Sequence, residues 1–249
     1  MRLHCLGTVG YHPNESRHTS CYYLPESGIL LDAGTGAFRL AQHIETDNLD
    51  VLLSHAHLDH TFGLTFLLDI LFQRPVKKLR IWGEREKIEV ISQHLFQELI
   101  FPAPLKAEWI PIDEQPTFQI GSATISWRRQ QHPGGSVAYR VEWPNGKRLV
   151  YATDTTGDTS EEYARWSHNA DLLMHECNFR DDSEKWAIET GHSWTSRVAE
   201  VACASKPKQL LVTHLNPLET SDDPVDIKAI RSRVDCPCQV AADEMVVDF

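Results

Sequence analysis

Four apolar segments constrain the fold of this chain, because each ends at a side chain able to bind a metal ion or transfer a proton. The segments span residues 49–53, 148–153, 171–174 and 209–213, and the polar residues that follow them are His55, Asp154, His175 with Glu176, and His214. Short apolar runs of this kind are typical of buried strands. In layered α/β proteins, residues at the carboxyl ends of strands gather at one rim. The pattern therefore predicts an α/β fold with a site assembled from distant parts of the sequence.

Residues 54–60 read Ser-His-Ala-His-Leu-Asp-His and are the densest group of candidate ligands. His55 and His57 are two positions apart, so in an extended loop their side chains point to the same side and can bind one metal ion. Asp59 and His60 enter a predicted helix, and we expect them to face a second ion. The alternative is a histidine-rich surface loop, which predicts no matching ligands elsewhere in the chain.

Composition narrows the class of protein and of partner. The chain has 249 residues, of which 41% are hydrophobic, and this suffices for an ordinary core without disulfides. No apolar stretch approaches the roughly 18 residues of a membrane span, and the N-terminus does not read as a signal peptide. We therefore expect a cytoplasmic protein with no membrane partner. The formal charge of −11 argues against a long nucleic acid as partner, because phosphate contacts require clustered Lys and Arg.

Other candidate groups have simpler interpretations. Cys236 and Cys238 form a Cys-Pro-Cys sequence that can bind metal, but no second cysteine pair accompanies it, so a turn before the last strand is preferred. His12 and His18 lie in a predicted loop between strands, where a single histidine is usually only exposed. A role for these four residues is left open.

The remaining pattern is that of short strands and helices without a linker or repeat, which predicts one domain over residues 1–249. A Gly-rich turn at residues 32–36 can in principle cradle a phosphate. It lacks the P-loop lysine, and a tight turn is the preferred interpretation. The predicted helices cover residues 37–44, 62–71 and 86–99, and further strands are predicted at 2–6, 20–24, 28–32, 79–82, 118–120, 123–129 and 136–143.

Several motifs carry a resemblance to a known family. The order H-x-H-x-D-H at residues 55–60 resembles the signature of the metallo-β-lactamase superfamily. Residues 175–179, His-Glu-Cys-Asn-Phe, and 191–196, Gly-His-Ser-Trp-Thr-Ser, resemble the H-E-A-T and H-S-T motifs of its ribonuclease Z group. Three further segments fit the same template, so that the resemblance covers nearly the whole chain: residues 7–10, 31–34 and 136–140. It implies an α/β fold of the four-layer αβ/βα sandwich type, with two mixed sheets and helices on the outer faces.

The resemblance also implies a centre of two divalent metal ions. One ion is held by His55, His57 and His132, the second by Asp59, His60 and His214, and Asp154 bridges the two. Each ion then keeps open coordination for water and substrate, as a catalytic site requires. Imidazoles and carboxylates suit Zn²⁺, while ligand identity alone leaves Mn²⁺ and Fe²⁺ open. Members with diiron redox chemistry typically carry Glu at the position of His57, so the histidine favours hydrolysis.

In the ribonuclease Z group, the H-E-A-T glutamate orients the H-S-T histidine, which assists departure of the leaving oxygen. These roles map to Glu176 and His192, and Asp59 is expected to accept the proton of the attacking water. The alternative for His192 is that it only caps the helix expected to run to Ser205, although Ser193 is an equally suitable cap.

Two departures from the group bear on the substrate. Bacterial members often carry a long tRNA-binding arm between the equivalents of His132 and Asp154, whereas here 154 − 132 = 22 positions are filled by two predicted strands and a Pro-Asn-Gly turn. The segment after His214 reads Asn-Pro-Leu at residues 216–218, in place of a Ser-rich stretch with an arginine. We therefore expect a phosphodiesterase acting on a small or cyclic phosphodiester.

Two other readings of the function stay open. The first is a lactone, thioester or other carbonyl hydrolase of the same fold, and the second is a non-catalytic metal-binding accessory protein. A homodimer is suggested only by analogy with the group.

Overall fold

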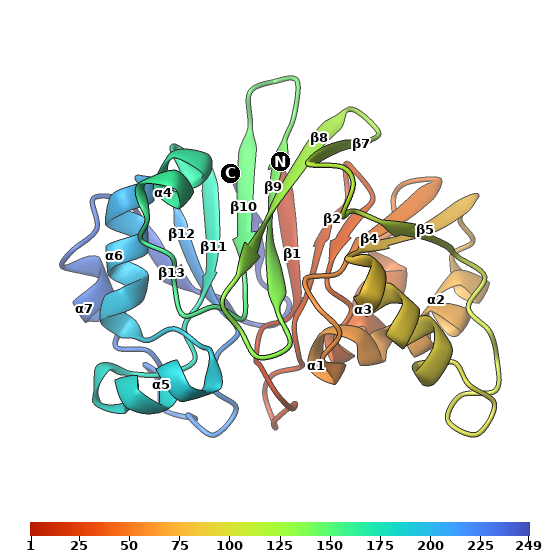
Figure 1. Cartoon of the computed structure of the whole chain (residues 1–249), viewed down its shortest axis with the longest axis horizontal. Coiled ribbons are helices and arrows are strands. Elements are labelled where there is room, and N and C mark those ends of the chain that lie inside the picture. The colour runs from red at the N-terminus through yellow and green to blue at the C-terminus, as the bar shows by residue number, and fades with distance from the viewer. The chain divides into compact units, whose positions relative to one another are not determined.

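The computed structural model describes all 249 residues, which form two compact units. Unit 1 comprises residues 1–121 and 242–248, and unit 2 comprises residues 122–241 and Phe249. The strands form two seven-stranded sheets, in the orders β14-β1-β2-β3-β4-β5-β6 and β13-β12-β11-β10-β9-β8-β7 (Figure 1). No helix combines the length and the apolar character that crossing a membrane requires.

The first sheet is antiparallel from β14 to β3 and parallel from β3 to β6. Its central strands β3 and β4 are buried along nearly their whole length, as their mainly apolar sequences favour. The strands of the first sheet are β1 (Arg2–Gly7), β2 (Cys21–Leu24), β3 (Ile29–Leu31), β4 (Asn48–Leu52), β5 (Lys78–Gly83), β6 (Glu108–Pro111) and β14 (Val246–Asp248). Strand β7 (Thr117–Ile120) also lies within the residues of unit 1 but belongs to the second sheet.

The helices of unit 1 pack apolar side chains against this sheet. Leu40, Leu67 and Ile88, from three different helices, join strand residues such as Val51 and Ile81 in one buried cluster. The helices are η1 (Thr35–Gln42), α1 (Leu58–Thr61), η2 (Phe62–Phe66), α2 (Leu67–Gln73), α3 (Arg85–Val90) and η3 (Ile91–Leu95).

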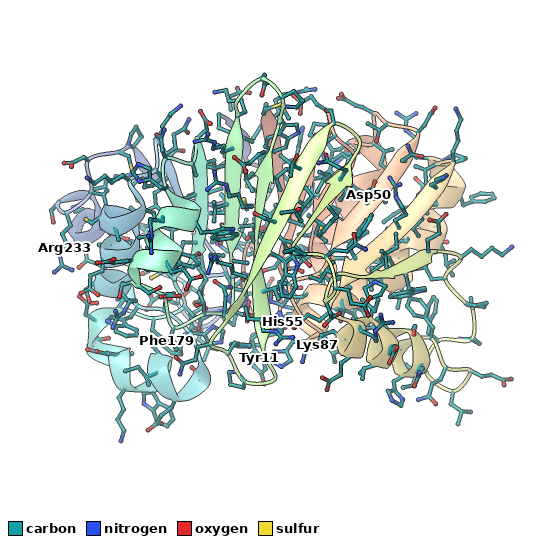
Figure 2. The ribbon with its side chains drawn as sticks, turned by 45° about the horizontal axis from the view of Figure 1, so that its top comes forward. Tyr11, Asp50, His55, Lys87, Phe179 and Arg233 are labelled. Atoms are coloured by element: carbon teal, nitrogen blue, oxygen red, sulfur yellow. The ribbon has the colours of Figure 1, made fainter.

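One charged residue lies inside the first sheet and is fully paired. Asp50 of β4, which is labelled in Figure 2, is buried, with 1% of its surface exposed. Its carboxylate accepts hydrogen bonds from Nε and Nη2 of Arg80, at 2.6 and 2.7 Å, and from Nε1 of Trp82 at 2.8 Å. Both partners lie on β5, so this buried anion is satisfied across the parallel pair, as burial of a charge requires.

Unit 2 is an antiparallel meander that continues into parallel strands. The meander runs from β8 to β10, and the pairs from β10 to β13 are parallel. A short turn joins β9 to β10, with the amide of Trp143 donating to the carbonyl of Lys147 at 3.0 Å, so the predicted hairpin between His132 and Asp154 is confirmed. The elements are β8 (Ala123–Gln130), β9 (Ser136–Glu142), β10 (Arg148–Ala152), α4 (Glu161–Ser167), β11 (Leu172–Glu176), η4 (Asp181–Ser183), α5 (Glu184–Thr190), α6 (Thr195–Ser205), β12 (Leu210–Thr213), α7 (Ile227–Arg231) and β13 (Cys238–Val240).

The predicted helices differ most from the structure. The helix expected over residues 86–99 ends earlier: α3 widens into the π-helical turn η3, and Leu99 beyond it is 95% exposed. The exposure of Leu99 means that no apolar burial stabilises helix in this segment. The predicted helix 62–71 is divided between η2 and α2, and the one at 37–44 is the 3₁₀ helix η1.

The Gly-rich turn at residues 32–36 packs against residues 19 and 20 of the same chain. The amide of Gly34 donates to the carbonyl of Ser20 at 2.8 Å, and that of Gly36 to the carbonyl of Thr19 at 3.3 Å. The interpretation as a tight turn is therefore confirmed, since these amides are engaged by the chain itself. The amide of Gly63 in turn donates to the carbonyl of Ala33 at 2.8 Å, which joins the turn to the segment that follows the histidine motif.

We predict that Gly63→Ala destabilises the protein. A Cβ at this position lies 2.1 Å from the carbonyl oxygen of Gly34, so two backbone segments must separate. Overpacking of this kind typically costs about 1–3 kcal/mol. The free energy of unfolding, measured by urea titration, should fall by that amount. Gly146→Asn is the control, because no atom lies within 4 Å of its Cβ and asparagine tolerates its φ of 82°. Equal stability of Gly63→Ala and the wild type contradicts the prediction.

Candidate metal centre

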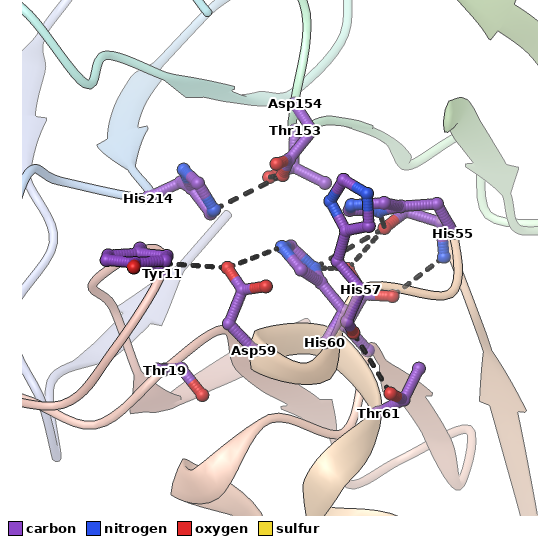
Figure 3. Close-up of polar contacts among 12 residues, drawn as sticks. Tyr11, Thr19, His55, His57, Asp59, His60, Thr61, Thr153, Asp154 and His214 are labelled. Atoms are coloured by element: carbon purple, nitrogen blue, oxygen red, sulfur yellow. Dashed lines mark hydrogen bonds and ion pairs between the residues drawn. The ribbon is translucent and has the colours of Figure 1, made fainter. Parts of the chain in front are cut away.

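In unit 1, the loop after β4 gathers the histidine motif. The ring centroids of His55 and His57 are 4.4 Å apart, and those of His55 and His60 are 4.3 Å apart (Figure 3). His55 and His60 are buried, whereas His57 is exposed. The motif thus forms one compact cluster of imidazoles, with Asp59 beside it: Oδ2 of Asp59 lies 3.3 Å from Nε2 of His60.

A carboxylate outside the motif holds this cluster in place. Asp32 follows β3 and is completely buried. Its Oδ1 accepts from the amide of Ser54 at 2.7 Å, and its Oδ2 accepts from the Ser54 hydroxyl at 2.7 Å and lies 2.7 Å from Nδ1 of His60. With Nδ1 engaged in this way, Nε2 of His60 is the nitrogen that remains for a metal ion. Such carboxylate–histidine pairs usually orient metal ligands.

In unit 2, Asp154 lies between two histidines. Its Oδ1 is 3.5 Å from Nε2 of His132, and its Oδ2 is 3.3 Å from Nε2 of His214. The hydroxyl of Thr153 donates to Oδ2 at 2.6 Å. His132 donates from Nδ1 to the carbonyl of Gly191 at 3.0 Å, so this imidazole also directs Nε2 toward the carboxylate. Figure 3 shows Asp154 and His214 facing each other.

The backbone supports the same arrangement. Asp154 follows β10 and His214 follows β12 of the second sheet, and their φ angles are 50° and 49°; Asp32 in unit 1 has 55°. Left-handed backbone in residues other than glycine costs free energy and concentrates at functional sites. Each of these residues leaves a strand by a sharp turn that presents its side chain at the strand end.

The separations between nitrogen and oxygen fit ligands of one ion. Zinc binds imidazole nitrogen and carboxylate oxygen at about 2.0–2.2 Å in tetrahedral geometry, so two such ligand atoms are about 3.4 Å apart. The contacts of Asp59 with His60 and of Asp154 with His132 and His214 measure 3.3–3.5 Å. The residues present within each unit therefore fit a divalent metal ion.

A second group in unit 2 consists of Glu176 and His192. Glu176 is completely buried at the end of β11 and accepts from Nδ1 of His192 at 2.9 Å, from the amide of Thr155 at 2.7 Å and from the amide of Ser193 at 3.1 Å. The His192 ring stacks on His214 with centroids 5.4 Å apart. Helix α6 begins with Trp194 as its N-cap and has no side-chain cap, so His192 does not cap it.

The other candidates have local partners. Nδ1 of His12 lies 2.9 Å from the carbonyl oxygen of Pro13, and Nδ1 of His18 lies 3.2 Å from the hydroxyl of Thr35. Burial raises the pKa of Cys238 to about 12 and also raises that of Cys236. Both thiols are therefore protonated at neutral pH in the unbound state, and a metal ion would have to displace their protons in order to bind.

The structure thus groups the candidate residues unit by unit. His55, His57, Asp59 and His60 lie together in unit 1, and His132, Asp154, Glu176, His192 and His214 lie together in unit 2. Sequence reasoning did not assign roles to Asp32, Tyr11 or Asn178. Tyr11 donates its amide to Asp59 at 2.7 Å, and Nδ2 of Asn178 donates to the carbonyl of His214 at 3.2 Å. For Asp32, the position directly after an apolar strand was a signal that the sequence already contained.

Comparison with known proteins agrees with this geometry. Residues 28–215 match the family model for the Beta-lactamase superfamily domain. A ribonuclease Z from Prochlorococcus marinus (strain MIT 9312) is 39% identical over 313 aligned positions, which cover 100% of both chains. The probable metallo-hydrolase YhfI of Bacillus subtilis is 29% identical over 225 positions, covering 86% of this chain and 87% of the relative. The crystal structure of human tRNase Z, short form, aligns with a TM-score of 0.77 and 22% identity over 100% of this chain and 99% of that one.

The chain belongs to the metallo-β-lactamase superfamily. Within it, the ribonuclease Z relatives make the chain ribonuclease Z-like, as the sequence motifs implied. The predicted fold class is confirmed, with two mixed seven-stranded sheets and accompanying helices as in the αβ/βα sandwich. The family and the clusters of His and Asp support a metal-dependent hydrolase that binds divalent metal.

A buried histidine beside the site makes the stability of unit 2 sensitive to acid. His175 is 1% exposed, donates from Nδ1 to the carbonyl of Glu176 at 2.8 Å, and makes no hydrogen bond with Nε2. Burial lowers its pKa below the ordinary value of 6.5. The unfolded chain therefore binds a proton at this residue at a higher pH than the folded chain does, and stability falls as the pH decreases below about 6.5.

We predict that His175→Asn reduces this pH dependence. Its amide can replace the Nδ1 donor but does not titrate, so the slope of unfolding free energy against pH between about 6.5 and 5 should decrease by up to about 1.4 kcal/mol per pH unit. Urea titrations of metal-free protein give the slope. The exposed His168→Asn is the control and should keep the wild-type slope. An unchanged slope in His175→Asn contradicts the assignment.

Proposed function

We propose that this chain hydrolyses a small or cyclic phosphodiester at a centre of two divalent metal ions. The observation that supports two ions best is the position of Asp154. Its two oxygens face different imidazoles, at 3.5 Å from His132 and 3.3 Å from His214. A carboxylate in this position is suited to bridge two ions, with one oxygen for each.

The proposed ligands follow the family resemblance. His55, His57 and His132 would hold the first ion, Asp59, His60 and His214 would hold the second, and Asp154 would be a ligand shared by both. Zn²⁺ is the expected metal because the donors are imidazoles and carboxylates, and Mn²⁺ and Fe²⁺ are accepted by the same donors. A single domain over residues 1–249 is part of this proposal.

Bound divalent ions polarise the phosphodiester oxygens and lower the pKa of the attacking water toward about 7. Asp59 is proposed to accept the proton from that water. His192 donates a proton to the leaving oxygen, because Glu176 engages its Nδ1 at 2.9 Å and leaves Nε2 for the substrate. A positioned general acid of this kind typically contributes about 10²- to 10⁴-fold in rate.

The preference for a small substrate is supported by what lies between His132 and Asp154. The β9–β10 hairpin fills this interval with a turn of residues 143–147. Over the whole chain, the alignment with the 39% identical ribonuclease Z has 313 positions for 249 residues, so at least 313 − 249 = 64 positions, distributed over the whole alignment, have no counterpart here. A formal charge of −11 further disfavours an extended polyanion as substrate.

Precursor tRNA is the second candidate substrate. It is favoured by the full-length similarity to proteins named ribonuclease Z and by the fold shared with human tRNase Z. Cyclic nucleotides, bis(p-nitrophenyl) phosphate, precursor tRNA and a lactone, assayed side by side, separate the candidates. Faster cleavage of precursor tRNA than of every small phosphodiester contradicts the proposed substrate class.

We predict that Asp154→Ala abolishes both metal uptake and hydrolysis. Removal of the bridging carboxylate deprives both proposed ion sites of a ligand, so metal content after dialysis against Zn²⁺ should fall from two ions per chain to none. Turnover of bis(p-nitrophenyl) phosphate should be lost in the variant and, reversibly, in the wild type treated with a chelator. Asp158→Ala is the control, because this exposed carboxylate follows the same strand without facing either histidine. Full activity in Asp154→Ala excludes the proposed centre.

We predict that His192→Ala lowers kcat on phosphodiesters by about 10²- to 10⁴-fold without loss of metal. The reason is that His192 acts on the leaving oxygen and is not a proposed ligand. Steady-state kinetics and metal analysis give the two quantities, and His168→Ala is the matched control on the surface of the same unit. Lactone turnover that exceeds phosphodiester turnover and is unchanged in His192→Ala instead identifies a carbonyl hydrolase. Bound metal without turnover on any ester identifies an accessory protein.

A further inference from the structure

We infer that the ring of Tyr11 is a stacking platform that makes the site prefer a phosphodiester with a nucleobase over one without. This inference rests on the proposed function and adds a specificity-determining residue to it. Tyr11 is 80% exposed, and nothing in the core depends on its ring. It lies at the same end of unit 1 as His55 (Figure 2) and beside Asp59 (Figure 3).

The position of Tyr11 is fixed by the site itself. Its backbone amide donates to Oδ2 of Asp59 at 2.7 Å, the same oxygen that lies 3.3 Å from Nε2 of His60. Hydrogen bonds to an ionised carboxylate are shorter and stronger than neutral ones. The loop is closed behind it by the amides of Thr8 and Val9, which both donate to the carbonyl of His18. The backbone that carries the aromatic side chain is therefore hydrogen-bonded directly to a proposed metal ligand.

The conformation of Tyr11 is unusual for an aromatic residue. Its φ is 61°, in the left-handed region where Gly, Asn and Asp are the common residues. This backbone places the amide on Asp59, which glycine or asparagine would also do. The bulky ring therefore adds nothing to the turn, and because it is exposed it adds little to packing. Its contribution is expected from a molecule that binds at the site.

The exposed ring of Tyr11 indicates which kind of ligand binds at the site. The only ring in contact with it is that of His12, at 5.1 Å between centroids and an interplanar angle of 59°. This tilted contact does not cover a face of the phenol ring in the way that a stacked neighbour does. Aromatic side chains beside a phosphate-binding site stack on nucleobases, and they do so without strong preference because every base has a π face. A ligand without a planar base cannot stack on the ring in this way and gains less from it.

The test compares Tyr11→Gly with Tyr11→Phe on two substrates. Glycine keeps the amide donor and the left-handed backbone but removes the ring, while phenylalanine keeps the ring. For adenosine 2′,3′-cyclic phosphate, Tyr11→Gly should raise KM about tenfold, with Tyr11→Phe close to the wild type. For a cyclic ribose phosphate that lacks a base, both variants should keep the wild-type KM. Phe72→Ala is the matched control, because Phe72 is an 87% exposed aromatic residue on α2 of the same unit.

Equilibrium binding separates failure of this inference from failure of the proposed function. Kd is measured for adenosine monophosphate and for ribose 5-phosphate with metal-loaded protein, which requires no turnover. Selective weakening of adenosine monophosphate in Tyr11→Gly supports the platform even if no phosphodiester is hydrolysed. An equal effect of Tyr11→Gly on ligands with and without a base, in KM or in Kd, overturns it and leaves the loop with a purely structural role.

Discussion

The hydrogen bonds of the Asp32 carboxylate are the interactions on which the histidine loop of unit 1 depends. A buried carboxylate is unfavourable unless it is hydrogen-bonded. Here its oxygens engage the amide and hydroxyl of Ser54 and Nδ1 of His60, each at 2.7 Å. These partners lie on the segment that follows the neighbouring parallel strand, so one anion sets the path of the loop and the orientation of an imidazole together. The histidine motif supplies the ligands, and a residue outside it determines where they point.

Unit 2 repeats this arrangement with different residues. Glu176 is also completely buried at the end of a strand, and its carboxylate engages the amides of Thr155 and Ser193 and Nδ1 of His192. In both units, a buried acid combines contacts to neighbouring loops with one contact to a histidine ring. The same carboxylate thus stabilises the loops and orients the imidazole. A change in the position of the loops therefore also changes the orientation of the ring.

Sequence patterns anticipated the strands that end at the site, because central parallel strands are apolar on both faces and their polar end residues stand out. They did not anticipate the end of α3, since the apolar periodicity continues to Leu99 although that residue is exposed. Nor did they indicate that Asp32 holds His60, 28 positions away. Such contacts depend on which strands are neighbours, and local periodicity carries no information about that. The role of Tyr11 was hidden for a related reason, because only the folded loop brings its amide to Asp59.

The β9–β10 hairpin has a consequence for how proteins of this shape diversify. His132 and Asp154 lie near its open end, whereas residues 144–146 at its tip are exposed. The free energy of closing a loop grows only slowly with length, by about 0.6 kcal/mol for each doubling. Additional chain can therefore be accommodated at the tip, or removed from it, while the strands keep the two side chains in place. Contacts with large ligands can therefore be gained or lost at the hairpin tip during evolution, while the residues of the site stay unchanged.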